Sequence, residues 1–188
     1  MQLDGANALT LSADGRFLFV GTSGGGSLAS VFSLDVNGVP SFVMAAQGTA
    51  PASSEQYYHT TSLTVSPDGK TLYVAEFDNG AYRLHTLAVG ADGQLSALDV
   101  IQPEGDVKQV VVSPDGSAVF VISGDSIGVY RRGADGVLAL ASQINAYDDS
   151  PDNRLDFNAI RSATLSADGT KLYLTGSFSF NEGLLILD

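Results

Sequence analysis

Three side chains from separate parts of the chain could together hydrolyse an ester or a lactone. They are His59, one of two histidines, and Lys108 and Arg161, two of nine basic residues against 21 acidic ones. An imidazole can act as general base to the water that attacks a carbonyl. A lysine and an arginine together can hold a carboxylate or a phosphate. The alternative interpretation is that both cations pair with acids such as Asp106 and Asp156, and that His59 is a packed loop residue.

A second group of candidates lies in segments predicted as loops, where binding residues usually occur. Aromatic rings in such loops can stack on a sugar or anchor a protein partner, although they also often pack between structural elements. The ligand-binding candidates are Tyr57, Tyr58, Glu76, Asp78, Asp125 and Arg154. His85 alternates with Arg83 and Leu87 in a predicted strand, so we expect it to face solvent.

The segment from Asp148 to Asp156 concentrates carboxylate oxygens, which calcium prefers as ligands. Its spacing is not that of an EF-hand, and Arg154 supplies a compensating charge within an ordinary turn composition. We therefore expect no cofactor, with calcium left open as an alternative. The weak candidate ligands are Asp148, Asp149, Asp152 and Asp156.

A repeated phrase of about ten residues determines how these side chains are positioned. It places Ser-Ala-Asp-Gly or Ser-Pro-Asp-Gly before a short apolar run, with its aspartates at Asp14, Asp68, Asp115 and Asp168. These residues form a tight turn, so each copy predicts a strand, a turn and a second strand. A later turn at Asn37-Gly38, Asp92-Gly93 or Asp135-Gly136 closes another hairpin in the first three repeats.

Four antiparallel strands in each repeat predict an all-β fold, a β-propeller with about four blades' worth of sequence. We expect a single propeller domain, or a fragment of one, over residues 1–188, with repeats at about 6–46, 60–102, 107–142 and 160–188. In a propeller the tight turns gather at one end and the other loops at the opposite end. Positions just before each inner strand should then ring the central channel: Asn7, His59 to Thr61, Lys108 and Arg161.

The phrase from Ser66 to Val74, Ser-Pro-Asp-Gly-Lys-Thr-Leu-Tyr-Val, resembles the repeat of lactonase-type and YVTN-type seven-bladed propellers. That superfamily includes bacterial 6-phosphogluconolactonase-like proteins. The resemblance implies that the chain is part of a seven-bladed ring and that a lactone is a possible substrate. We expect an unpaired strand edge at residues 184–187, to be covered by the remaining blades or by a second copy of the chain.

The composition of the chain limits the classes of partner that we expect. A formal net charge of −12 opposes binding to nucleic acid, and no apolar run is long enough for membrane insertion. No signal segment is evident at the start of the chain, so we expect a soluble protein. The chain has no cysteine, so redox chemistry does not indicate the compartment, and secreted, envelope and cytoplasmic locations all stay open.

Two functions remain from the sequence. The first is a propeller scaffold that binds a protein or carbohydrate ligand through its loops, which requires no assembled catalytic group. The second is a lactone hydrolase in which Lys108 and Arg161 bind an anionic substrate and His59 activates water.

Overall fold

The computed structural model describes residues 5–23, 27–47, 58–78, 80–124, 126–145, 159–178 and 181–187. All regular structure within these ranges is β-strand, which confirms the all-β prediction. The strands are β1 (Ala6–Leu11), β2 (Phe17–Thr22), β3 (Ser27–Leu34), β4 (Pro40–Gln47), β5 (Tyr58–Val65), β6 (Thr71–Asp78), β7 (Ala81–Val89), β8 (Leu95–Ile101), β9 (Gln109–Val112), β10 (Ala118–Ile122), β11 (Ser126–Arg132), β12 (Leu138–Asn145), β13 (Ala159–Leu165), β14 (Leu172–Phe178) and β15 (Asn181–Leu187).

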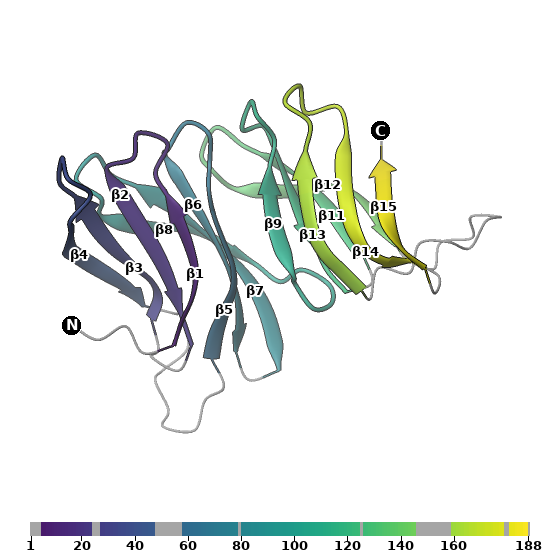
Figure 1. The fold of residues 1–188 in the computed structure, drawn as a ribbon, viewed down its shortest axis with the longest axis horizontal. Coiled ribbons are helices and arrows are strands. Elements are labelled where there is room, and N and C mark those ends of the chain that lie inside the picture. The colour runs from purple at the N-terminus through teal and green to yellow at the C-terminus, as the bar shows by residue number, and fades with distance from the viewer. Residues whose placement is uncertain are drawn as a thin grey trace. The chain divides into compact units, whose positions relative to one another are not determined.

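Each strand pairs with its neighbour in the sequence to form antiparallel sheets (Figure 1). The sheets are β1–β4 (blade 1), β5–β8 (blade 2), β9–β12 (blade 3) and the three described strands β13–β15 (blade 4). Blades 1 and 2 form one compact unit, Met1–Gln102, and blades 3 and 4 form a second, Pro103–Asp188. We call these unit 1 and unit 2 and describe each by itself.

Side chains of the repeated phrase explain why it turns. In blade 2 the Ser66 hydroxyl donates to Asp68 Oδ1 (2.5 Å), which also accepts from the Lys70 amide (3.0 Å). Ser66 Oγ in turn accepts from the Thr71 amide (2.9 Å). Gly69 follows with φ of 69°, the left-handed region that favours glycine. The same serine–aspartate hydrogen bond occurs in the other three copies, so the predicted hairpins are confirmed.

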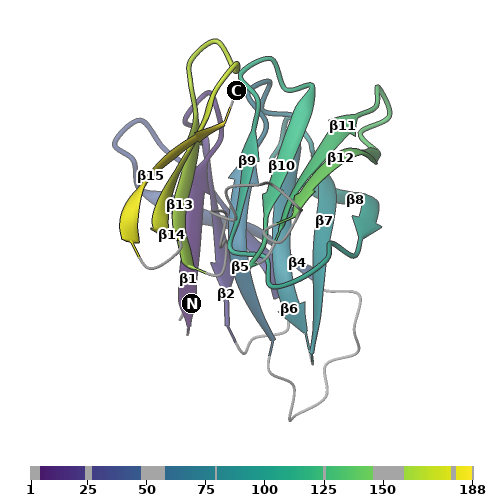
Figure 2. The same ribbon diagram turned by 90° about the vertical axis from the view of Figure 1, so that its right-hand side faces the viewer.

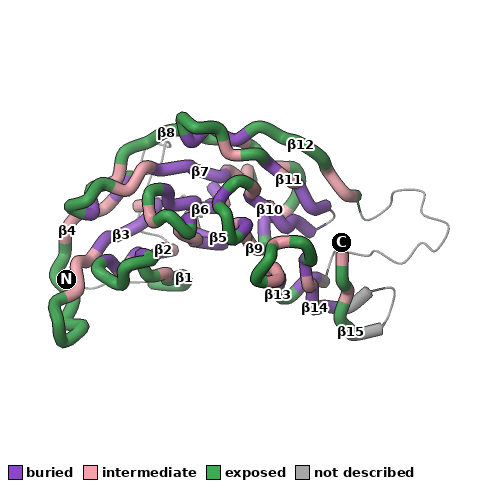
Figure 3. Tube along the Cα trace, turned by 90° about the horizontal axis from the view of Figure 1, so that it is seen from above, coloured by how far each residue is buried: buried purple, intermediate pink, exposed green. Residues whose placement is uncertain are grey.

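The core of unit 1 lies between blades 1 and 2. Phe19 and Val31 of blade 1 belong to one apolar cluster with Leu72, Val74 and Leu87 of blade 2. Burial is greatest in the middle strands and falls toward the outer strands β4 and β8 (Figure 3). Blade 2 therefore presents the face that carries residues 72, 74 and 87 to blade 1.

Unit 2 repeats this packing between blades 3 and 4, whose strands are seen in Figure 2. Ile122 and Ile127 of blade 3 cluster with Leu172 and Leu174 of blade 4. Two hydrogen bonds join the inner strands β9 and β13. The side-chain amide of Gln109 donates to the Ala163 carbonyl oxygen (3.0 Å) and accepts from the Ala163 backbone amide (2.7 Å).

Candidate functional site

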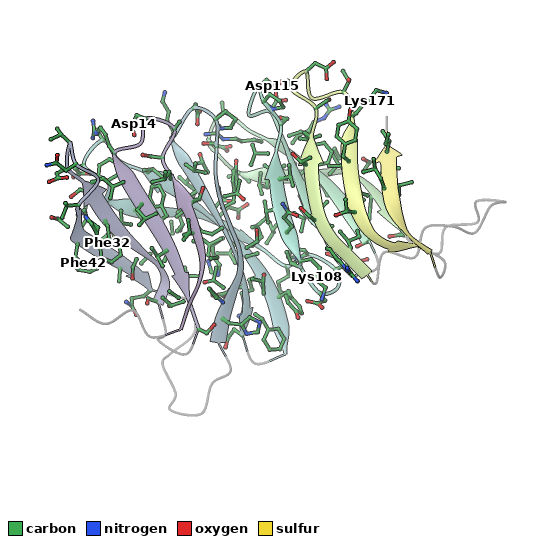
Figure 4. The ribbon with its side chains drawn as sticks, in the orientation of Figure 1. Asp14, Phe32, Phe42, Lys108, Asp115 and Lys171 are labelled. Atoms are coloured by element: carbon green, nitrogen blue, oxygen red, sulfur yellow. The ribbon has the colours of Figure 1, made fainter. Side chains whose placement is uncertain are left out.

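His59 is the second residue of β5, the inner strand of blade 2. This strand begins at the end of unit 1 opposite the Asp14 turn (Figures 1 and 4). His59 falls within β5 rather than before it, so the strand begins earlier than expected. Its backbone forms an isolated antiparallel bridge with Ser23. Its half-buried ring lies 5.2 Å from the Phe77 ring, centroid to centroid, at 40°. His59 is therefore held in place while remaining partly open to solvent.

Asn7 fixes the backbone next to His59. Its side-chain amide donates to Ser23 Oγ (2.9 Å) and to the Thr60 carbonyl oxygen (2.8 Å). The Thr60 hydroxyl donates to the Leu28 carbonyl oxygen (3.0 Å). Blade 1 approaches so closely that a Cβ on Gly21 would lie 2.6 Å from the Thr60 methyl carbon. Asn7, which the sequence analysis placed at the channel mouth, therefore also has a structural role, because it joins blade 1 to blade 2.

Glu76 and Asp78 do not lie in a loop, which corrects the sequence-based expectation. Both belong to β6, with 0% and 3% of their surface exposed. Arg83 of β7 donates to Asp78 Oδ2 (2.9 Å) and lies 3.5 Å from Glu76 Oε1. Both carboxylates are partners of one guanidinium, and a ligand-binding role for them stays a prediction.

The prediction that His85 faces solvent is wrong. Only 1% of the residue is exposed, and its Nε2 lies 2.7 Å from Glu76 Oε1. Arg83, His85 and Leu87 do share one face of β7, as expected, but this face packs on blade 1. We call Glu76, Asp78, Arg83 and His85 the buried ion network.

The two candidate cations lie in unit 2. Lys108 directly precedes β9 and, as the alternative interpretation expected, forms an exposed ion pair with Asp106. It lies at the end of the unit opposite Asp115 and Lys171 (Figure 4). Arg161 is an exposed residue of β13. His59 belongs to unit 1, so the convergence of these two cations with it on one site stays a prediction.

Several candidates fall outside the described residues: Tyr57, Asp125, Arg154, Asp148, Asp149, Asp152 and Asp156. For Tyr58 only the backbone is described, as the first residue of β5. Within the described ranges no group of three or more His, Asp or Glu side chains is placed to hold a metal ion. The calcium alternative therefore rests on residues that the structure leaves undescribed.

The turn aspartates have structural roles at the opposite end of each unit. Hydrogen bonds from Ser113 and from the amide and hydroxyl of Ser117 lower the pKa of Asp115 to about 2. Hydrogen bonds from Ser166 and Thr170 lower the pKa of Asp168 to about 2 in the same way. Between the turns of blades 1 and 2 lies an open pocket of about 390 Å³. The hydrogen bonds of the turns therefore account for the repeated aspartates.

Sequence reasoning missed the ring contacts of Phe77 and Tyr82 beside His59, and the ion pairs of Arg83 with Glu76 and Asp78. The available signal was the Asn-Gly pair at positions 79–80, which typically forms a two-residue hairpin. Such a hairpin extends β6 and β7 until Asp78 pairs with Ala81. It also places residue 76 opposite residue 83, and residue 77 opposite residue 82.

Residues 47–175 match the family described as Lactonase, 7-bladed beta-propeller. The chain belongs to this family, which confirms the resemblance read from the Ser66–Val74 phrase and the propeller fold. Among the described residues, no helix has the length and apolar character needed to cross a membrane.

Solved structures give the same fold. The periplasmic gluconolactonase PpgL of Pseudomonas aeruginosa is 28% identical, with a TM-score of 0.67 over 76% of this chain and 40% of that chain. A candidate 6-phosphogluconolactonase of Bacteroides fragilis is 22% identical, with a TM-score of 0.70 over 98% and 54%. A similar candidate from Bacteroides uniformis is 23% identical, with a TM-score of 0.69 over 95% and 51%. The chain thus spans about half the length of these proteins or less, and no curated protein matches it.

Proposed function

We propose that this chain contributes to a seven-bladed propeller that hydrolyses a sugar lactone. The observation that carries the proposal is the family match over residues 47–175, a range that includes His59, Lys108 and Arg161. The 28% identical structure is a gluconolactonase, which favours an aldonolactone as substrate. The comparisons lend no support to the scaffold function that the sequence alone placed first.

In the proposed reaction, His59 accepts a proton from a water molecule as the water oxygen bonds to the lactone carbonyl carbon. The bond between that carbon and the ring oxygen then breaks, and the imidazolium returns its proton to the departing ring oxygen. The product is an open-chain aldonic acid. The partly open ring of His59 and the anchored backbone beside it suit this role.

Lys108 and Arg161 are proposed to bind an anionic group of the substrate. Both lie at the start of inner strands of unit 2 and are exposed. The Asp106 partner of Lys108 is also exposed, so an anionic ligand can replace a surface ion pair that contributes little free energy. Their approach to His59 in the assembled ring is part of the proposal.

Lactone hydrolysis followed in a pH-stat tests the proposal with gluconolactone and its 6-phosphate. We expect His59→Ala to lower kcat by at least about a hundredfold, with an unchanged circular dichroism spectrum. Lys108→Ala should raise KM for the phosphorylated lactone. Lys70→Ala, an exposed lysine at the turn end of unit 1, is the matched control and should change neither constant. An unchanged rate in His59→Ala would exclude His59 as the base.

Chelation tests the calcium alternative separately. A rate lost in EDTA and regained with calcium would assign a metal-dependent reaction and direct attention to Asp148, Asp149, Asp152 and Asp156. A rate that EDTA leaves unchanged would remove calcium from the proposal.

A further inference from the structure

Three aromatic rings form a row across blade 2 at the end where β5 begins. His59 and Phe77 are cross-strand partners with ring centroids 5.2 Å apart. Phe77 and Tyr82 are the next cross-strand pair, at 4.8 Å and an interplanar angle of 50°. We call these three residues the aromatic row. Phe77 and Tyr82 have no part in the mechanism proposed above.

The aromatic row differs from the packed core of the same unit. Core side chains such as Phe19 and Val31 are fully buried and wholly apolar. The rings of the row are only half-buried, and both ends carry polar atoms, the imidazole nitrogens of His59 and the phenol oxygen of Tyr82. An apolar surface with polar groups at its edges is typical of a ligand site rather than of a core.

The buried ion network supports the row from the opposite face of the same strands. Successive residues of a strand point to opposite faces of the sheet. Phe77 and Tyr82 therefore project from one face, and Glu76, Asp78 and Arg83 project from the other. Arg83 joins both carboxylates, at 2.9 Å to Asp78 and 3.5 Å to Glu76. These ion pairs connect β6 to β7 where the two rings project. The row is therefore held in place before any ligand arrives, which lowers the entropy lost on binding.

We propose that the aromatic row binds the face of a pyranose ring. The C–H groups on one face of a pyranose form an apolar surface that packs on aromatic rings, and its hydroxyls reach the polar atoms at the ends of the row. The inference rests on the proposed function and names the sugar ring as the part of the substrate recognised there. A sugar stacked on Phe77 would lie beside His59, the proposed base.

Binding of 1,5-anhydro-D-glucitol to the full chain tests the inference without turnover, because this pyranose has no carbonyl to hydrolyse. We expect saturation-transfer NMR to show contact with its C–H protons, and Phe77→Ala or Tyr82→Ala to raise Kd about tenfold, or about 1.4 kcal/mol. Phe77→Leu keeps an apolar side chain without the ring and should show the same loss. The matched control is Phe42→Ala, since Phe42 pairs with Phe32 in blade 1 at 5.7 Å and is exposed.

Three results would overturn the inference: no saturation transfer to the sugar, an equal loss in Phe42→Ala, or full affinity in a folded Phe77→Leu variant. Its failure is distinguishable from failure of the proposed function. Sugar binding without lactone hydrolysis keeps the aromatic row and removes the hydrolase. Hydrolysis that persists in Phe77→Leu, together with no saturation transfer from the unsubstituted chain to the probe, keeps the hydrolase and removes the row.

Discussion

At the scale of single residues, one guanidinium compensates two buried carboxylates in blade 2. We predict that Arg83→Met destabilises the protein by about 3 kcal/mol, because Glu76 and Asp78 stay buried after their cation is removed. Thermal unfolding should show a decrease in Tm on the order of 10 °C. Adding Asp78→Asn should restore part of it. Lys108→Met, which breaks an exposed ion pair, is the control and should cost no more than about 1 kcal/mol. Equal effects of the two substitutions would contradict this account.

Asp115 makes stability depend on pH. Hydrogen bonds from Ser113 and Ser117 lower its pKa in the folded state to about 2, from an ordinary value of 3.8. The folded carboxylate therefore binds a proton less readily than the unfolded one. Its contribution is complete above pH 3.8 and is lost as pH falls through about 2.

We predict that Asp115→Asn has a lower Tm than the unsubstituted chain near neutral pH, and that the difference disappears by about pH 2. Ser113→Ala removes the largest cause of the lowered pKa of Asp115. The pH-dependent part of its Tm difference from the unsubstituted chain should therefore be smaller than that of Asp115→Asn. Circular dichroism melts over this pH range make the measurement. A difference that does not change with pH would show that the charge of Asp115 is irrelevant to the turn.

At the scale of elements, a turn of blade 2 is fitted to a ring of blade 1. Gly93 has φ of 81°, and a Cβ there would lie 2.5 Å from Cε1 of the buried Phe17 ring. Gly38 has φ of 76° in the equivalent turn of blade 1, with open space around it. The two glycines thus share the conformational requirement and differ in the steric one.

Gly38→Ala should therefore cost about 1–2 kcal/mol from backbone strain alone. Gly93→Ala should cost more, because Phe17 must also move within a packed core. Chemical denaturation gives the free energy of unfolding of each variant, and the difference between the two losses is the steric cost of moving Phe17. Equal losses would mean that Phe17 yields freely and that blade packing does not depend on this contact.

The sequence predicted the blades well because turn residues act locally. Ser66, Asp68 and Gly69 form their turn through contacts within five residues, so the repeat alone predicts the hairpin. The fate of His85 depended on which sheet face meets blade 1, and that is decided by residues far away in the sequence. The same limit applies to the site: β5 positions His59 within unit 1, whereas its proposed partners belong to unit 2.

At the scale of the whole molecule, the net charge of −12 acts against the anionic substrate that Lys108 and Arg161 are proposed to bind. Salt screens interactions beyond a Debye length, about 30 Å at 0.01 M and about 10 Å at 0.1 M. We predict that kcat/KM for 6-phosphogluconolactone rises over this salt range, because long-range repulsion is screened before the short contacts with the two cations. Neutral gluconolactone, the matched control, should show no change.

The opposite sign is equally informative. A decrease of kcat/KM for the phosphorylated lactone with salt would mean that the field near the site is positive and that the two cations, rather than the net charge, govern the approach of the substrate. Lys108→Ala should then abolish the salt dependence while leaving neutral gluconolactone unaffected. Identical salt responses for the two lactones would contradict an anion-binding role for Lys108 and Arg161 and would leave His59 as the one residue of the three with a proposed role in hydrolysis.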